Sequence, residues 1–331
     1  MTTPVSPFGL TPRNAIAGIG GALASVMMFY SAFRGGTGLG IVLLPLLPLP
    51  ALIAGLGWGM GAAVVVVLTS AVVVAAIASP GLAAVYALML SLPALGTTHV
   101  MSLARYDDDG ALTHWYPVGR IVMALALYGA ALPVLLIAFD GGSWSAIAPD
   151  LARTIKATAS KPWVSPDWRA LNDEQIKGIA DVFVQLMPAL VAFYWTLFFL
   201  LNVYLAARVV KISGKLMRPW PNLHWMTFPA GFALAPALAL TGVWFGGSLR
   251  VIGTGALGAL LVAFVLQGLS VVHAAAASRK ASWLLSLTYT ALIVLGTIMT
   301  PLLALLGVGE ALFHLRRRVI SIPAALPPGS L

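Results

Sequence analysis

The sequence contains no cysteine and few charged residues. Lys, Arg, Asp and Glu make up only 9% of its 331 residues, whereas about a quarter of the residues in a soluble domain are charged. Water is therefore not the main solvent of this chain. The lack of cysteine also excludes disulfides, thiolate metal sites and cysteine nucleophiles from its chemistry.

Signatures of familiar catalytic and cofactor sites are missing as well. The sequence has no phosphate-binding Walker motif, no HExxH zinc motif and no GxSxG nucleophile motif. The run Asp107-Asp108-Asp109-Gly110 lacks the spacing and the terminal glutamate of a calcium loop, so we interpret it as a solvated turn. We therefore expect no enzyme activity, no catalytic residue, no cofactor and no metal site.

Long apolar runs are what the sequence has in abundance, since 60% of its residues are hydrophobic. About 20 apolar residues carry a helix across a bilayer core of about 30 Å, and clusters of Gly or Pro divide the longer runs. This gives nine segments, at 13–34, 37–54, 58–79, 81–100, 121–139, 182–207, 219–249, 251–278 and 281–309. We predict an all-α polytopic transmembrane helix bundle of 8–9 spans, forming a single integral membrane domain over residues 1–331.

The positions of Lys and Arg predict how this bundle is oriented in the lipid bilayer. Short loops rich in these residues stay cytoplasmic, and the strongest such loop carries Arg208, Lys211, Lys215 and Arg218. Counting back by alternation places both termini inside. The net charge of +9 is spread over loops rather than over one continuous basic face, so it indicates orientation and no nucleic-acid partner. The expected location is the bacterial cytoplasmic (inner) membrane.

The triplet Arg316-Arg317-Arg318 conflicts with nine complete crossings, because it would then lie on the outer side. We expect Pro301 to split the last segment and to leave residues 302–315 as a short interfacial or re-entrant helix. The tail would then return to the cytoplasm. Alternatively, the Pro-rich stretch from Leu44 to Pro50 does not cross fully.

Three polar stretches flank the predicted spans: a tail at 1–12, an extracytoplasmic loop at 140–181 and a flexible tail at 319–331. The loop has helical patterns of its own. Asn172 followed by Glu174 and Gln175 predicts the start of the helix that enters the sixth segment. A short amphipathic helix before it is predicted from apolar residues on one face, at Ile147, Leu151 and Ile155.

Few polar groups lie inside the predicted spans, and each is a functional candidate because burying it costs free energy. His273, Gln267 and Ser270 lie in the eighth segment, and Asn202 lies near the inner end of the sixth. A hydrogen bond between helices is the simplest interpretation of these groups. For His273 the functional alternatives are a proton relay, a ligand contact, or a base in a lipid-modifying enzyme.

Small residues recur at four-residue spacing in the first segment. Gly18 with Ala22, and Gly20 with Ala24, allow helix backbones to approach closely inside a membrane. Packing within this chain explains the pattern without a partner. The functional interpretation is docking of this helix onto a separate membrane subunit.

Four stretches of the chain form recognisable motifs. They are Pro45 to Pro50 continuing to Gly55-Leu56-Gly57-Trp58-Gly59, Trp115 to Arg120, Asn202 to Arg208 with Arg218-Pro219-Trp220-Pro221, and Arg316-Arg317-Arg318. With these motifs, most of the chain resembles the DUF2232 family of bacterial membrane proteins, which includes YybS-like proteins. No chemical role attaches to the motifs themselves.

That family is distantly similar to the substrate-binding S-components of energy-coupling-factor vitamin transporters. In those proteins small residues on the first helix dock onto a transmembrane coupling subunit, and the resemblance carries this role to Gly18, Gly20, Ala22 and Ala24. The present chain departs from the S-component plan by about three extra spans and a long outer loop.

Two functional hypotheses follow from these patterns. The first is a transporter-like module that binds a small, largely apolar or neutral solute and has no energy source of its own, because pocket-forming Pro and Gly breaks accompany a lack of embedded charges. The alternative is a non-catalytic scaffold or regulator of a membrane complex, which would use the first helix and the basic inner loop.

Overall fold

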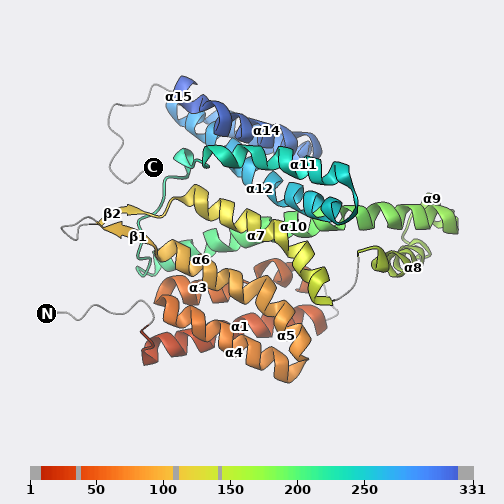
Figure 1. The fold of residues 1–331 in the computed structure, drawn as a ribbon, viewed down its shortest axis with the longest axis horizontal. Helices are drawn as coiled ribbons and strands as arrows, with labels where there is room; N and C mark the ends of the chain where they lie inside the picture. Colours follow the sequence, from red (N-terminus) through yellow and green to blue (C-terminus); the bar gives the residue numbers. More distant parts are fainter. Residues whose placement is uncertain (1–8, 35–38, 107–111, 141–143, 320–331) are drawn as a thin grey trace. The chain divides into compact units, whose positions relative to one another are not determined.

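The computed structural model describes residues 9–34, 39–106, 112–140 and 144–319 (Figure 1). The chain divides into two compact units. Unit 1 comprises Met1–Leu125, Thr196–Ala233 and Val262–Leu331, and unit 2 comprises Ala126–Trp195 and Leu234–Leu261. The predicted turn at Asp107 to Gly110, and nearly all of the predicted tail at 319–331, lie outside the described residues.

Seven helices in the described part of the chain are long and apolar enough to cross a membrane. This confirms a helical, multi-pass membrane protein. The helices are α1 (Pro12–Arg34), α4 (Met60–Ile77), the continuous run of α5 (Pro80–Tyr86), η2 (Ala87–Ser91) and α6 (Leu92–Ser102), then α7 (Val118–Asp140), α10 (Asp173–Ile212), α12 (Gly247–Ser278) and α14 (Gly296–Phe313).

Two of the nine predicted segments form shorter and more irregular helices than expected. Segment 37–54 becomes α2 (Leu39–Leu43), η1 (Leu44–Leu46) and α3 (Leu49–Trp58). Segment 219–249 contains η4 (Leu223–Trp225), η5 (Ala230–Leu234) and α11 (Ala235–Phe245). Repeated prolines account for both cases, because each proline removes a backbone donor and clashes with the preceding turn.

The last segment is split, but not at Pro301 as predicted. Helix α13 (Ser282–Val294) ends at Leu295, which has the non-helical dihedral angles φ −118° and ψ 36°, and α14 begins at Gly296. Pro301 lies inside α14, since membrane helices tolerate proline where neighbouring groups compensate for the lost hydrogen bond. The predicted interfacial helix at 302–315 is therefore mostly the second half of α14.

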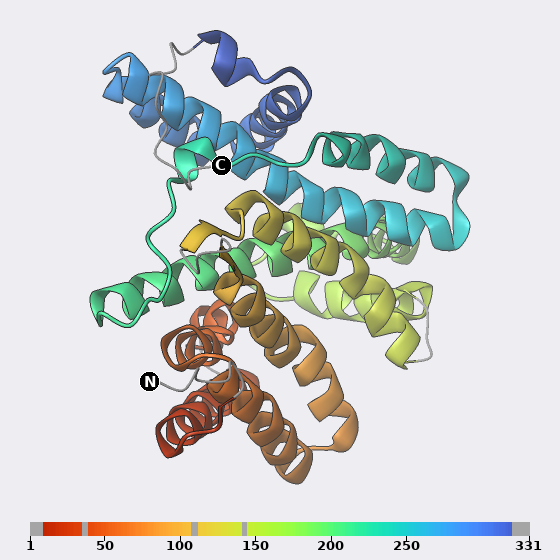
Figure 2. The same ribbon diagram turned by 60° about the vertical axis from the view of Figure 1, so that its left-hand side comes forward.

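In unit 1, helix α1 packs along α4 and α3 (Figure 1, Figure 2). The contact is close because Gly18 has no Cβ: a Cβ at this position would lie 2.6 Å from the carbonyl oxygen of Ala62. Next to it, Val26 and Tyr86 are buried in one apolar cluster. A hydrogen bond of 2.9 Å between the hydroxyls of Ser70 and Ser91 joins α4 to η2, a π-helical turn.

Two further features of unit 1 determine where its chain segments meet. A two-stranded antiparallel sheet, β1 (Ala104–Tyr106) and β2 (Leu112–Trp115), connects α6 to α7. A Cβ at Gly119, at the start of α7, would lie 1.9 Å from the carbonyl oxygen of Thr227. Glycine at this position therefore lets the segment after η4 lie directly against α7.

The short helix α15 (Leu315–Val319) follows α14 and is the last helix of unit 1 in the described part of the chain.

Unit 2 contains the helical part of the loop at 140–181. The predicted amphipathic helix is present as η3 (Trp144–Ile147) and α8 (Ala148–Ala159), followed by α9 (Pro166–Arg169). The predicted helix start is also confirmed. The amide of Gln175 donates to Oδ1 of Asn172 at 2.8 Å, and the amide of Asn172 donates to Oε1 of Gln175 at 2.9 Å, which is a reciprocal capping box at the beginning of α10.

Candidate ligand-binding cavity in unit 1

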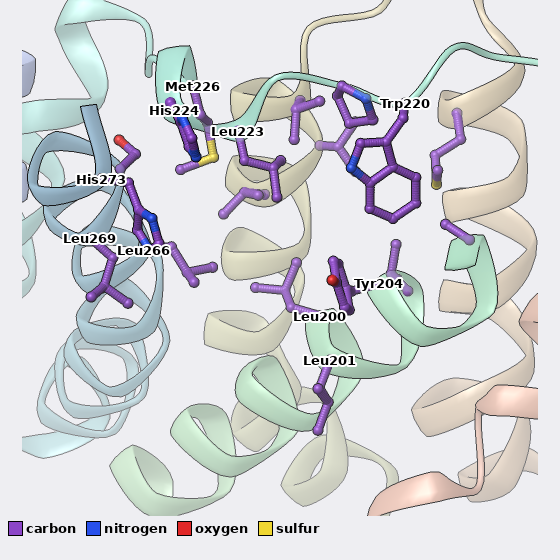
Figure 3. A pocket seen from close by; sticks show the side chains of 18 of the residues that line it. Leu200, Leu201, Tyr204, Trp220, Leu223, His224, Met226, Leu266, Leu269 and His273 are labelled. Carbon is purple, nitrogen blue, oxygen red and sulfur yellow. The ribbon is translucent and has the colours of Figure 1, made fainter. Parts of the chain in front are cut away.

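Unit 1 contains a partly open cavity of about 560 Å³, within the size range of about 300–1,000 Å³ that is typical of small-molecule sites. It lies between the first turns of α7, the second half of α10, the second half of α12 and the segment from 216 to 226 (Figure 3). The residues at its wall are Met101, Val118, Ile121, Val122, Leu197, Leu200, Leu201, Val203, Tyr204, Ala207, Leu216, Arg218, Trp220, Pro221, Leu223, His224, Met226, Val262, Leu266, Leu269, Ser270, His273 and Tyr289.

Helical periodicity builds the apolar walls of this cavity. On α10 the lining residues include Leu200, Val203, Tyr204 and Ala207, and on α12 they include Val262, Leu266, Leu269 and His273. Both sets follow the three- and four-residue spacing that places side chains on one face of a helix. The cavity is therefore a property of two facing helix surfaces, and most of what a ligand would touch there is apolar.

Polar groups gather on one side of the cavity. Nε2 of His273 and the hydroxyl of Tyr289 form a hydrogen bond of 2.8 Å. The ring of His224 stacks on that of His273 with centroids 5.3 Å apart and an interplanar angle of 17°. Figure 3 shows the two imidazoles facing each other from η4 and α12. This arrangement offers a ligand both hydrogen-bonding and aromatic contacts.

Of the four polar groups singled out from the sequence, His273 and Ser270 line the cavity and the other two do not. The hydroxyl of Ser270 donates to the carbonyl of Gln267 at 2.7 Å. Gln267 itself is fully buried, and neither its Nε2 nor its Oε1 has a hydrogen-bond partner among the described residues. Nδ2 of Asn202 donates to the carbonyl of Pro45 at 2.5 Å, so Asn202 ties α10 to the Pro-rich segment.

Arg218 is a cation at the cavity wall, and 7% of its surface is exposed. Its Nη2 donates to the carbonyl of Tyr116 at 3.2 Å. Its Nε and Nη1 are buried without a hydrogen-bond partner among the described residues. Removal from water disfavours the charged guanidinium, so burial lowers the pKa of Arg218 below its ordinary value.

Other cations lie beside the same part of the cavity. The guanidinium of Arg208 and the ammonium of Lys211 lie 5.3 Å and 4.9 Å from the ring centroid of Trp220, which is itself a lining residue. Lys215 lies 3.7 Å from the ring centroid of Trp58. These cation–π contacts hold the basic segment in place. The three cations also give this side of unit 1 a positive potential.

Comparison with known proteins gives the chain a family. Residues 22–309 match the family described as Predicted membrane protein (DUF2232). The chain belongs to this family. The resemblance noted in the sequence is thereby confirmed. No curated protein and no solved structure matches the chain, so the distant likeness to S-components of energy-coupling-factor transporters gains no support from them.

In this DUF2232 protein, a buried ion pair fixes the segment that supplies His224. Glu310 and Arg316 are 3% and 2% exposed, and Oε1 of Glu310 accepts a hydrogen bond from Nε of Arg316 at 2.8 Å. Nη2 of Arg316 also donates to the carbonyl of Met226 at 2.8 Å, and its Nη1 donates to the carbonyl of His224. All the charged nitrogens of Arg316 therefore have partners, as a buried pair requires.

The small residues proposed for helix docking divide between two faces of α1. Gly18 and Ala22 are buried within unit 1 and serve its internal packing. Gly20 and Ala24 are exposed. No atom of another element in the described chain lies within 4 Å of a Cβ added at Gly20. Docking of a partner on this helix stays a prediction, and it now concerns only the exposed pair.

Two polar residues of the cavity, His224 and Tyr289, could not be identified from the sequence. His224 lies in a segment that we predicted to be a span, although Pro219 and Pro221 just before it are typical of irregular chain. Tyr289 lies 16 residues after its partner His273 and on another helix, and no local pattern predicts such a pair. Among the described residues, no group of three or more His, Asp or Glu side chains could hold a metal ion.

Proposed function

We propose that this DUF2232 protein is a transporter-like membrane protein that binds a small, largely apolar solute in the cavity of unit 1 and has no energy source of its own. The observation that carries the proposal is the cavity itself, about 560 Å³ in volume and lined mostly by apolar side chains of α7, α10, α12 and the segment from 216 to 226. Protein interiors are otherwise close-packed, with few voids larger than a water molecule, so a cavity of this size favours a bound molecule.

The distribution of apolar and polar residues in the lining also supports binding of a solute in one orientation. An apolar body would lie against Leu200, Leu266 and Leu269, while a polar end would meet His273 and Tyr289. Sites for small molecules typically combine apolar walls with a few such polar groups. We place this site in the bacterial cytoplasmic membrane, with both termini and the basic loop at 208–218 on the cytoplasmic side.

Native mass spectrometry of the protein, extracted together with its surrounding lipids, tests this function. We expect the wild-type protein to carry an adduct of defined mass. Ala207→Phe inserts a ring from the cavity wall and should remove the adduct. Val209→Phe adds the same ring to an exposed position of the same helix and should retain it. Absence of any adduct or saturable solute on the wild-type protein would reject the proposal.

A second candidate function is that of a non-catalytic scaffold or regulator of a membrane complex. It is favoured by the exposed pair Gly20 and Ala24 on α1, since small residues let a second helix approach closely. The two functions are compatible, because the exposed pair and the cavity lie on different helices of unit 1.

A further inference from the structure

We infer that the solute is an anionic amphiphile whose head group, a phosphate or a carboxylate, pairs with Arg218. This inference rests on the proposed function, because it assigns a chemical class to the occupant of the same cavity. It begins from the two unpartnered nitrogens of Arg218, Nε and Nη1, at the wall of a mostly apolar cavity.

Leaving a buried guanidinium half satisfied is costly. Among the described residues, its side chain finds one hydrogen-bond acceptor, the carbonyl of Tyr116. A charged group that is removed from water needs a counter-charge or a complete set of hydrogen bonds. The ring centroid of Trp115 lies 5.9 Å from the guanidinium carbon. This ring adds an aromatic contact but no acceptor for Nε or Nη1. Two nitrogens of the guanidinium, with three N–H donors between them, therefore lack an acceptor among the described residues.

The described part of unit 1 offers no carboxylate to complete this site. Its one acidic residue there is Glu310, and both carboxylate oxygens of Glu310 already accept hydrogen bonds from Arg316. Arg208 and Lys211, which flank Trp220, add two further positive charges near the same wall. An excess of cations around unpaired donors favours an anionic ligand.

The position of Arg218 argues against a contact with ordinary surrounding lipid. Charged side chains that reach the lipid head groups extend outward and keep the charged group in water. The preceding residue, Met217, does point outward, since 62% of its surface is exposed. Arg218, the next residue, is 7% exposed and lines the cavity. The guanidinium fork matches the geometry of phosphate or carboxylate oxygens. The apolar walls at Leu200, Leu266 and Leu269 would hold a chain or ring system attached to that head group, and the pair of His273 and Tyr289 would meet a second polar group on it.

Equilibrium binding to the full-length protein in nanodiscs of zwitterionic lipid tests the inference. The probes are decyl phosphate and decanoate as anionic amphiphiles, decanol as a neutral one and inorganic phosphate as a free anion, each corrected for protein-free nanodiscs. We expect saturable binding of at least one anionic amphiphile, tighter than that of decanol. Arg218→Gln should weaken this binding by about 10- to 100-fold, as expected for loss of a charge-assisted hydrogen bond, and leave decanol binding unchanged.

Two further variants control for charge and folding. Arg279→Gln removes one positive charge from an exposed position of unit 1 that does not line the cavity, and it should bind the anionic probes like the wild type. Arg218→Lys keeps the charge without the fork and should bind with intermediate affinity. Retained decanol binding shows that Arg218→Gln is folded.

The outcomes separate the two proposals. If decanol binds as tightly as the anionic probes, or if Arg218→Gln and Arg279→Gln behave alike, the anionic head group is wrong while the solute-binding function stands. If inorganic phosphate binds as tightly as decyl phosphate, the apolar chain is wrong. If no amphiphile shows saturable binding, the proposed function fails together with this inference.

Discussion

Nη2 of Arg316 donates a hydrogen bond of 2.8 Å to the carbonyl oxygen of Met226, 90 residues earlier in the chain. The bond joins α15 to the segment that lines the cavity. Because Glu310 neutralises the same guanidinium, Arg316 is no longer a free positive charge that would orient the C-terminus by itself. The arginine triplet therefore carries less topological weight than its sequence indicates.

We expect Arg316→Met to destabilise the protein by about 3–5 kcal/mol, because it leaves the Glu310 carboxylate buried without a counter-charge. Equilibrium unfolding in mixed micelles would measure this loss. Arg317→Met changes a neighbouring exposed residue and should have little effect. The double variant Glu310→Leu with Arg316→Met should regain part of the lost stability, and equal stabilities of the two single Arg variants would contradict the buried pair.

Gly307→Ala should destabilise the contact between α12 and α14. A Cβ at this position would lie 2.0 Å from the carbonyl oxygen of Phe264, so one of the two backbones must move. Overpacking of this kind costs about 1–3 kcal/mol, measurable by the same unfolding titration. Gly309→Ala is the matched control on the same helix, because its Cβ would meet only a side-chain atom of Leu315 at 3.4 Å. Helix propensity favours alanine over glycine at both positions, so similar changes in stability in the two variants would contradict the packing explanation.

Much of the fold could be predicted because single residues and short patterns act locally. The reciprocal cap of Asn172 and Gln175 and the apolar runs of α4 and α12 are examples. The break between α13 and α14 was expected near Pro301 but lies at Leu295. The prediction assumed that the missing backbone donor of Pro301 would end the helix. In the structure Pro301 lies inside α14, because neighbouring groups in a packed membrane helix compensate for the lost hydrogen bond.

Only part of the candidate site could be predicted from the sequence. His273 and Ser270 stand out as polar residues in an apolar run, and both line the cavity. His224 and Tyr289 reach His273 through tertiary contacts, which no spacing rule encodes. Glu310 lies at the edge of an apolar segment, so counting uncharged runs treated it as a boundary rather than as a buried partner of Arg316.

The scaffold hypothesis makes a prediction about the two faces of α1. Gly20→Leu with Ala24→Leu enlarges exposed positions and should abolish co-purification with a membrane partner while leaving stability unchanged. Gly18→Leu should instead destabilise the protein, because its Cβ would lie 2.6 Å from the carbonyl oxygen of Ala62. Complexes captured by cross-linking before extraction would report the partner. Identical complexes in the wild type and in the Gly20 and Ala24 variant would count against docking on this face.

The proposed orientation can be tested without background, because the natural chain contains no cysteine. Ser160→Cys lies after α8 in the loop predicted to be extracytoplasmic, and Ser213→Cys follows α10 in the basic loop predicted to be cytoplasmic. Both serines are exposed and donate only to a backbone carbonyl three or four residues earlier, so the two substitutions are chemically matched. A membrane-impermeant maleimide should label Ser160→Cys in intact spheroplasts and Ser213→Cys only after permeabilisation. Since α10 connects the two positions and spans the bilayer, labelling of both from the same side would require this helix to turn back inside the membrane. The reverse pattern would invert the orientation and place the cations around Arg218 on the outer side, where they would meet extracytoplasmic anions instead of cytoplasmic ones.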